Sequence, residues 1–425
     1  MSERLIDQRW PWLVAAGLIL LVFASTFVEI GPPPAADRRP VGGVDDIAAL
    51  GERDDVNVLF VLIDTLRADR LGSYGYERDT SPGLDALADT GVRFARHLAQ
   101  SSWTKASMAS LWAGLYPART GITRFDQVIP PIAELPAETL AKAGFYTAGI
   151  YRNGWVAPNF GFDQGFEIYT RPAPMAIPAT VKRENPTLTD QATDESAIES
   201  ALEFLRVHGE RRWFLYLHLM DVHEYLYDLE SALFGSTHSD IYDNSIRHTD
   251  AVLQVLIDAL SAQGLREKTV IVVASDHGEA FGERGFEGHA REVYRETTEV
   301  PLLISLPFRL EPGIVVDART RNLDLWPTLF DLLGLEGPAG ADGRSLVPAM
   351  LAAARGETPP DAESVAIVED GLRYVRIEHN GDRLEELFDG RADPAELTDL
   401  SEEDPEKLEV IQGAIKYLQR KNQAR

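Results

Sequence analysis

Short apolar runs alternate with helical patterns along most of the chain, and this alternation constrains the fold more than any other feature. The helical patterns cover residues 81–95, 104–114, 189–207 and 241–263. Between them lie runs typical of strands in a covered parallel sheet: residues 57–63 (NVLFVLI), 147–151 (TAGIY), 213–219 (WFLYLHL), 269–276 (TVIVVASD) and 300–307 (VPLLISLP). This order predicts the α/β fold class, with a mostly parallel sheet sandwiched by helices.

The two ends of the chain differ from this middle part. Residues 31–55 are rich in Pro, Gly and charged side chains, and they are predicted to be a linker. Residues 336–363 are rich in Gly, Pro and Ala, and short strand-like pieces and an acidic helical end follow them. We therefore expect an α/β domain over 56–335 and a small C-terminal α+β subdomain, with antiparallel strands and a terminal helix, over 336–425.

The first 30 residues contain a long apolar segment. Residues 12–28 (WLVAAGLILLVFASTFV) carry no charge and no polar face, and they approach the roughly 20 residues that a helix needs to cross a bilayer. Residues 1–30 are therefore predicted to be a single-pass membrane anchor, with the following domain outside the cytoplasm at the cell membrane. Val22-Phe23-Ala24 resembles a signal-peptide cleavage site, so the alternative is a cleaved signal segment and a secreted or periplasmic protein.

Charge and composition narrow the classes of partner. The chain has 41 Lys and Arg against 67 Asp and Glu, a net charge of −26, which argues against a nucleic-acid partner and against electrostatic docking on anionic lipid. It has no cysteine, which excludes a disulfide, a thiolate nucleophile and a Cys-bound zinc. An acidic chain that handles an anionic substrate must neutralise it locally, with a metal ion or a few cations.

Three of the predicted strands end on side chains that can bind a metal ion: Asp64, the pair Asp221 and His223, and the adjacent Asp276 and His277. A single aspartate at a strand end is often only a turn former or a helix cap. Because the carboxyl ends of parallel strands meet at one edge of the sheet, three such ends favour a shared site. Gly278 leaves the backbone beside the last pair free to turn both side chains towards one cation.

The segment 101–117 (SSWTKASMASLWAGLYP) has a threonine at the start of its helical pattern. Thr104 fits an N-cap, whose oxygen accepts from amides of the first helical turn. The same position is also an anion site, because free amides and the helix dipole point at it. A hydroxyl bound to a cation there would attack a phosphoryl or sulfuryl group. The residue pattern leaves both roles open.

Taken in order, these segments resemble the sulfatase branch of the alkaline phosphatase superfamily over about residues 55–400. In that comparison Asp64 corresponds to the first metal aspartate. Residues 104–117 correspond to the nucleophile helix, which usually reads Cys/Ser-x-Pro-x-Arg and, further on, Thr-Gly-x-Tyr-Pro. The other matching segments are LHLMDVHEYLY (217–227), SDHGEAFGERGFEGH (275–289), NLDLWPTLFDLLGL, DGRSLVP and LEELFDGRADPAELTDL.

Several positions depart from the family pattern. Thr104 replaces the Cys or Ser that the main sulfatases convert to formylglycine, a conversion that does not accept threonine. The other departures are Thr65 for the second Asp of an Asp-Asp pair, Ala106 for Pro, Met108 for Arg, His277 for Asn, Arg152 for Lys and Gly154 for His. The resemblance therefore implies a non-formylglycine variant with a threonine nucleophile, similar to the phosphodiesterases and phospho-transferases of the superfamily.

The metal-ligand candidates are Asp64, Thr104, Asp276 and His277. Because this set mixes nitrogen and oxygen, Zn²⁺ or Mn²⁺ fits it better than Ca²⁺. A possible second metal set consists of Asp221, His223 and His289. His218 lies inside a predicted strand and is assigned to the core rather than to the site.

The resemblance also implies catalytic and substrate-binding roles. Thr104 is the candidate nucleophile and His223 or His289 the candidate acid, while Lys105, Arg152 and Asn153 are candidates for binding the substrate. The expected activity is metal-dependent hydrolysis of phosphate esters (diesters or phosphonates) or sulfate esters, so the expected partner is an anionic ester. The alternatives are a membrane-anchored phospho-headgroup transferase and a catalytically silent member that binds an anion or a glycan.

Overall fold

The computed structural model describes residues 37–174, 192–290, 292–358, 372–379, 382–389 and 400. The predicted anchor at 12–28, the strand-like piece at 364–370 and the acidic C-terminal helix lie outside these residues. Within the described part of the chain, no helix combines the length and the apolar character needed to span a membrane.

The predicted α/β fold class is confirmed by an eight-stranded sheet of order β10-β2-β9-β6-β1-β5-β3-β4. All neighbouring strands are parallel except β9, which pairs antiparallel with β2 and β6. The strands are β1 (Asn57–Ile63), β2 (Val92–Leu98), β3 (Tyr146–Tyr151), β4 (Ile168–Thr170), β5 (Trp213–Leu219), β6 (Thr269–Ala274), β9 (Leu302–Ser305) and β10 (Ile314–Arg321).

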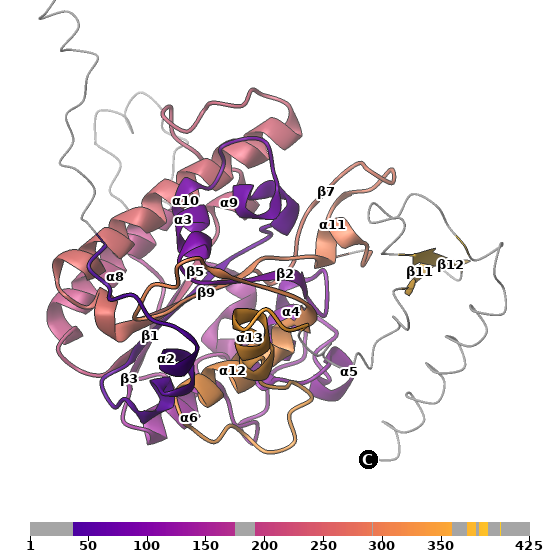
Figure 1. Ribbon diagram of the computed structural model, residues 1–425. Helices are drawn as coiled ribbons and strands as arrows, with labels where there is room; N and C mark the ends of the chain where they lie inside the picture. The colour runs from indigo at the N-terminus through magenta and orange to yellow at the C-terminus, as the bar shows by residue number, and fades with distance from the viewer. Residues whose placement is uncertain are drawn as a thin grey trace, which may run out of the picture. The chain divides into compact units, whose positions relative to one another are not determined.

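Helices cover both faces of this sheet (Figure 1). The side chains of β1 alternate between the faces: Val58, Phe60 and Leu62 pack in one core cluster, and Leu59, Val61 and Ile63 in the other. The first cluster includes residues of α4 (Thr104–Ala113), α6 (Pro136–Lys142), α12 (Leu325–Leu332) and α13 (Val347–Ala354). The second includes residues of α3 (Pro82–Asp89), α8 (Asp194–His208) and α10 (His238–Ala262).

The other α-helices are short: α2 (Val44–Ala48), α5 (Pro117–Thr120), α9 (Asp221–Glu224) and α11 (Arg295–Thr298). Two further antiparallel pairs lie outside the main sheet: the two-residue strands β7 (Ala280–Phe281) and β8 (Glu287–Gly288), and β11 (Leu372–His379) with β12 (Asp382–Asp389).

The helix predicted over residues 81–95 is too long. Helix α3 ends at Asp89, and strand β2 begins at Val92. A Cβ atom at Gly91 would lie 2.6 Å from the backbone oxygens of Leu87 and Ile304, so the chain turns tightly here onto the neighbouring strand. The apolar residues of VRFARHL are spaced so that they fit the period of a helix as well as that of a strand. The segment forms a strand because it pairs with β9 and β10.

Segments on both sides of residues 56–335 pack on the sheet domain. Part of the expected linker packs on the sheet domain: Ile47 and Leu50 are buried, and Arg39 donates to Ser305 Oγ at 3.0 Å and to the Leu306 carbonyl at 2.9 Å. At the other boundary, α13 contributes Met350 to the main core. The packed domain therefore extends beyond residues 56–335 in both directions.

His97 on β2 is completely buried between two polar partners, with Nδ1 2.8 Å from Thr320 Oγ1 and Nε2 2.8 Å from Asn322 Oδ1. Burial lowers the pKa of His97 to about 4. The folded protein therefore keeps this ring neutral, whereas the unfolded chain binds a proton below about pH 6.5. The contribution of His97 to the free energy of unfolding should fall as pH drops from 7 towards 4, because the unfolded state takes up the additional proton.

Replacing His97 with Gln keeps a polar side chain but removes this titration. Between pH 7 and pH 5 the unmodified protein should lose about 2 kcal/mol more unfolding free energy than the H97Q variant. Urea unfolding of both proteins at the two pH values measures this difference. Equal losses would show that His97 does not titrate in this way.

Candidate active site

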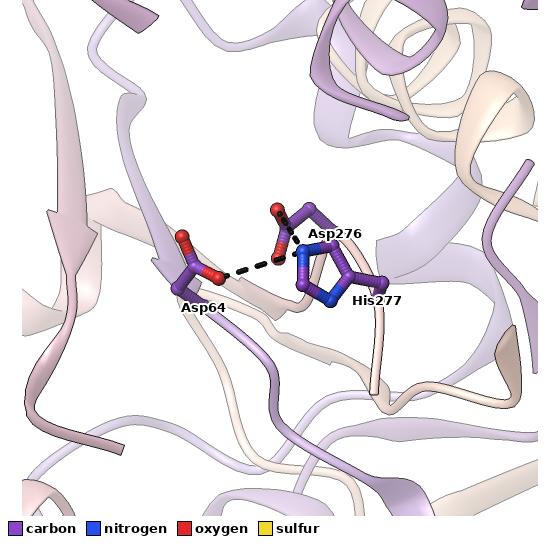
Figure 2. A group of neighbouring side chains, drawn as sticks. All are labelled: Asp64, Asp276 and His277. Atoms are coloured by element: carbon purple, nitrogen blue, oxygen red, sulfur yellow. Dashed lines mark ion pairs between the residues drawn. The ribbon is translucent and has the colours of Figure 1, made fainter. Parts of the chain in front are cut away.

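Two neighbouring strands and one helix bring the candidate site together. Strands β1 and β6 are parallel, and Leu62 pairs with Ala274. Asp64 and Asp276 therefore each follow two residues beyond this pair, at the same edge of the sheet. Figure 2 shows their carboxylates converging with the ring of His277.

Asp64, Asp276 and His277 form a buried group with the geometry of a metal site. Each offers one ligand atom, and the three atoms lie within 4.8 Å of one another. His277 Nε2 lies 3.7 Å from Asp64 Oδ1 and 3.3 Å from Asp276 Oδ2. These same two carboxylate oxygens have no hydrogen-bond partner. Because a buried oxygen without a partner is costly, their convergence on one nitrogen fits a bound cation.

His277 is prepared to serve as a neutral ligand. Its Nδ1 lies 3.0 Å from the Gly278 carbonyl, which only accepts hydrogen bonds, so Nδ1 carries the proton and Nε2 keeps its lone pair. Burial lowers the pKa of His277 to about 4. Together with Asp64 and Asp276, His277 therefore offers a mixed set of nitrogen and oxygen donors that fits a metal ion.

The two carboxylates have opposite electrostatic surroundings. Burial, and then the charge of Asp64, raise the pKa of Asp276. Burial also acts to raise the pKa of Asp64, but the hydrogen bond from His218 and the nearby histidines outweigh it, so this pKa lies below its usual range. Asp64 is therefore the carboxylate held in its charged form, and Asp276 is the one that a cation would stabilise most.

Thr104 does not act as a helix cap. It is the first residue of α4, and the N-cap position belongs to Trp103, which makes no side-chain cap. The Thr104 hydroxyl lies 3.0 Å from His277 Nε2 and 3.5 Å from Asn153 Nδ2. The side chain thus points at the group of Asp64, Asp276 and His277, and the first backbone amides of α4 remain available to an anion.

His218 is a site residue that the sequence analysis placed in the core. It is buried on β5, opposite Leu62 of β1. Its Nε2 donates to Asp64 Oδ2 at 3.0 Å, and its Nδ1 accepts from Tyr216 Oη at 2.7 Å. Asn153 Nδ2 donates to the same Asp64 oxygen at 2.6 Å. These two donors fix Asp64 so that its other oxygen faces His277.

His289 and His223 lie beside this group. The ring centroids of His289 and His277 are 4.5 Å apart, and those of His223 and His289 are 5.1 Å apart. Glu279, which the sequence analysis did not single out, holds His289 through contacts of 3.1 and 3.2 Å to Nδ1. Burial acts to lower the pKa of His289, but the hydrogen bond to Glu279 and its charge raise it.

The predicted second metal set is not brought together as a group. Among the described residues, one group of acidic and histidine side chains has the geometry of a metal site, and it consists of Asp64, Asp276 and His277. Asp221 instead pairs with Arg152 and accepts from the Asp194 amide at 3.0 Å.

Arg152 and Lys105, predicted to bind substrate, have other partners. Arg152 also contacts Asp194 and Glu224, each at 2.5 Å, so a substrate anion would compete with three carboxylates for it. Lys105 Nζ donates to the Phe125 carbonyl at 2.7 Å. Arg152 and Lys105 are therefore both paired within the folded chain, Arg152 with carboxylates and Lys105 with a backbone carbonyl.

Comparison with known families agrees with this geometry. The model of the sulfatase family matches residues 56–335. The chain belongs to the sulfatase family. It is thus an ester hydrolase of the alkaline phosphatase superfamily, and the matched residues include the strand ends, Thr104 and His289.

Curated relatives and solved structures extend this similarity over most of the chain. The chain is 26% identical to a choline-sulfatase of Rhizobium meliloti (strain 1021), over 81% of this chain and 82% of that protein. It is 25% identical to an ulvan-active sulfatase of Formosa agariphila, over 71% of this chain and 67% of that one. The fold also matches the phosphonate monoester hydrolase of Agrobacterium radiobacter with a TM-score of 0.65 and 21% identity, covering 87% of this chain and 95% of that one.

Proposed function

We propose that this sulfatase-family protein is a metal-dependent hydrolase of anionic phosphorus esters, phosphate diesters or phosphonate monoesters, with Thr104 as its nucleophile. The observation that carries the proposal is the position of the Thr104 hydroxyl, 3.0 Å from His277 Nε2, where the unpartnered oxygens of Asp64 and Asp276 also converge. A hydroxyl needed only for packing or capping would have no reason to point there.

Asp64, Asp276, His277 and Thr104 would hold the cation, which supplies Lewis-acid charge and favours the alkoxide form of the hydroxyl. The amides of the first turn of α4 and the amide group of Asn153 bind the remaining oxygens of the ester. Thr104 Oγ1 forms a bond to phosphorus as the bond from phosphorus to the leaving oxygen breaks. Water then hydrolyses the phospho-threonine and restores the hydroxyl.

The leaving oxygen needs a proton, and His289 is the better-placed donor. Its pKa is raised by Glu279, which favours a ring that carries a proton before the ester bond breaks. His223, next to it, is the second candidate. In the second step the same ring takes a proton from the attacking water.

Sulfate esters are the second candidate substrates, because the curated relatives are named as sulfatases. The threonine favours phosphorus: the formylglycine route implied by the family resemblance is not open to Thr104. A phospho-headgroup transferase would follow the same first step, with an alcohol in place of water. A catalytically silent member would bind the anion without turnover.

Metal analysis and a substrate panel test the proposal on one preparation of purified protein. We expect close to one equivalent of Mn²⁺ or Zn²⁺, and faster turnover of 4-nitrophenyl phosphonate monoesters and phosphate diesters than of 4-nitrophenyl sulfate. Preferred sulfate hydrolysis would select the second candidate, and no turnover with bound metal would select a silent binder. Added glycerol distinguishes transfer from hydrolysis, because a transferase would form the glycerol ester.

Glu279 should affect catalysis through the pKa of His289. In an E279Q variant the ring loses its charged partner, so its pKa falls and the protonated acid is lost at a lower pH. We expect kcat/KM to fall on the order of tenfold at neutral pH, with the alkaline limb of the pH–rate profile shifted to lower pH.

A matched control for this variant is E283Q. Glu283 lies four residues along the chain and contacts Arg67 at 2.5 Å instead of a histidine. An E279Q profile that coincides with that of E283Q would show that Glu279 does not act on the proton donor.

The location of the protein stays a prediction. The proposed single-pass anchor at 12–28 would hold the hydrolase on the outer side of the cell membrane, with secretion after cleavage as the alternative. Fractionation of cells expressing the full chain and a chain without residues 1–30 tests it. Recovery of the full chain in the soluble fraction, with its N-terminus intact, would contradict both.

A further inference from the structure

Four aromatic side chains form a connected group next to the nucleophile; we call Trp103, Phe125, Trp155 and Phe160 the ring cluster. Trp103 packs edge-to-face on Phe125 and Trp155, with centroids 5.2 and 5.6 Å apart. Trp155 also contacts Phe125 at 5.5 Å and Phe160 at 5.7 Å. These separations are those of interacting rings. The cluster is nevertheless not a closed core, because Phe125 is 68% exposed.

The ring cluster is attached to the reacting groups at two points. Trp103 directly precedes Thr104, so their Cα atoms are about 3.8 Å apart. The backbone amide of Trp155 donates to Asn153 Oδ1 at 2.8 Å, and the Nδ2 atom of the same asparagine side chain donates to Asp64. A leaving group on an ester held at Thr104 would therefore have exposed aromatic surface within its reach.

Lys105 determines which kind of leaving group this surface accepts. Its Nζ lies 3.6 Å from the ring centre of Phe160 and 5.7 Å from that of Trp155. Two of the four rings in the cluster thus already have a cation over their faces. A quaternary ammonium in the leaving group would be repelled by this resident charge, whereas Trp103 and the exposed Phe125 remain available to a neutral ring.

We propose that the ring cluster is the leaving-group subsite of this hydrolase and that it binds a neutral aryl ring. The inference rests on the proposed function, because it takes Thr104 as the point of attack. Stacking on Trp103 and Phe125 stabilises the bound ester beyond what the anion alone provides, and it selects aryl over alkyl and cationic leaving groups.

Calorimetric binding to the Mn²⁺-loaded protein tests the subsite without turnover. Benzylphosphonate mimics an aryl phosphate, with a methylene in place of the bridging oxygen, and methylphosphonate is the same anion without the ring. We expect benzylphosphonate to bind on the order of tenfold more tightly. In an F125A variant this preference should shrink to about twofold or less, while the affinity for methylphosphonate stays within about twofold.

Ile132→Ala is the matched control, since Ile132 is 92% exposed and lies seven residues after Phe125, outside the ring cluster. This variant should keep the full preference. Equal binding of the two phosphonates, or an unchanged preference in F125A, would overturn the subsite. Tighter binding of phosphocholine or glucose 6-phosphate than of benzylphosphonate would overturn the aryl assignment. If methylphosphonate itself does not bind, the proposed function fails together with the subsite.

Discussion

Replacing Thr104 with Val should abolish turnover while leaving the fold and most of the metal affinity intact. Valine has nearly the same shape as threonine but no hydroxyl, so it removes the atom that lies 3.0 Å from His277 Nε2. Loss of a nucleophile in a preorganised site costs on the order of 10⁴-fold or more in kcat. Asp64, Asp276 and His277 remain, so the affinity for the metal should fall by no more than the loss of one ligand causes, on the order of tenfold.

Kinetics on 4-nitrophenyl phosphonate and phosphate esters, with metal content measured on the same samples, check this prediction. Thr139→Val is the matched control, because the Thr139 hydroxyl on α6 has no hydrogen-bond partner and belongs to no part of the site. That variant should keep normal kinetics. Activity retained by T104V would show that the attacking group is not this hydroxyl but a water molecule or another side chain.

The residues that the sequence placed well are those whose position follows from strand order alone. Asp64 and Asp276 follow apolar strands, and adjacent parallel strands bring their carboxyl ends to one edge. Thr104 was ambiguous because a helix start serves a cap and an anion site equally. The contact of its hydroxyl with His277, a residue 173 positions away, is what favours a role in the site, and no local pattern reveals that contact.

The residues that the sequence misplaced depend on neighbours that no local pattern reveals. His218 contacts Asp64 because β5 pairs with β1 in one register; a histidine within an otherwise apolar strand was the available signal, since a buried polar ring needs partners. Arg152 has the right charge for an anion, but the fold surrounds it with carboxylates from α8 and α9. Residues 92–95, the first part of β2, were assigned to a helix because the apolar pattern there suits a helix as well as a strand.

Replacing Asp276 with Asn should stabilise the metal-free protein and weaken metal binding and catalysis. Asp276 Oδ2 is buried without a hydrogen-bond partner and lies 3.3 Å from His277 Nε2. An amide nitrogen at that place can donate to the histidine lone pair, and the repulsion with Asp64 disappears. We expect a gain of about 1–3 kcal/mol in unfolding free energy in the presence of a chelator.

This gain should be larger at pH 8 than at pH 5. Burial and Asp64 raise the pKa of Asp276 in the folded protein, so the folded state keeps a proton that the unfolded chain has already lost. The contribution of Asp276 to the stability of the metal-free wild type therefore falls as pH rises through this range, whereas the amide of the variant does not titrate.

Added metal should reverse the order of the two proteins. At 100 to 1,000 times its Kd, Mn²⁺ would stabilise the wild type by about 3–4 kcal/mol, while D276N gains little and loses on the order of 10³-fold in kcat/KM. Thermal unfolding with chelator and with metal measures both effects, and Asp317→Asn, whose side chain is 76% exposed, controls for the loss of one charge. A D276N protein that is less stable than the wild type without metal would mean that the converging oxygens are satisfied within the chain. The reversal is expected because the same two carboxylate oxygens destabilise the metal-free protein and bind the cation when it is added.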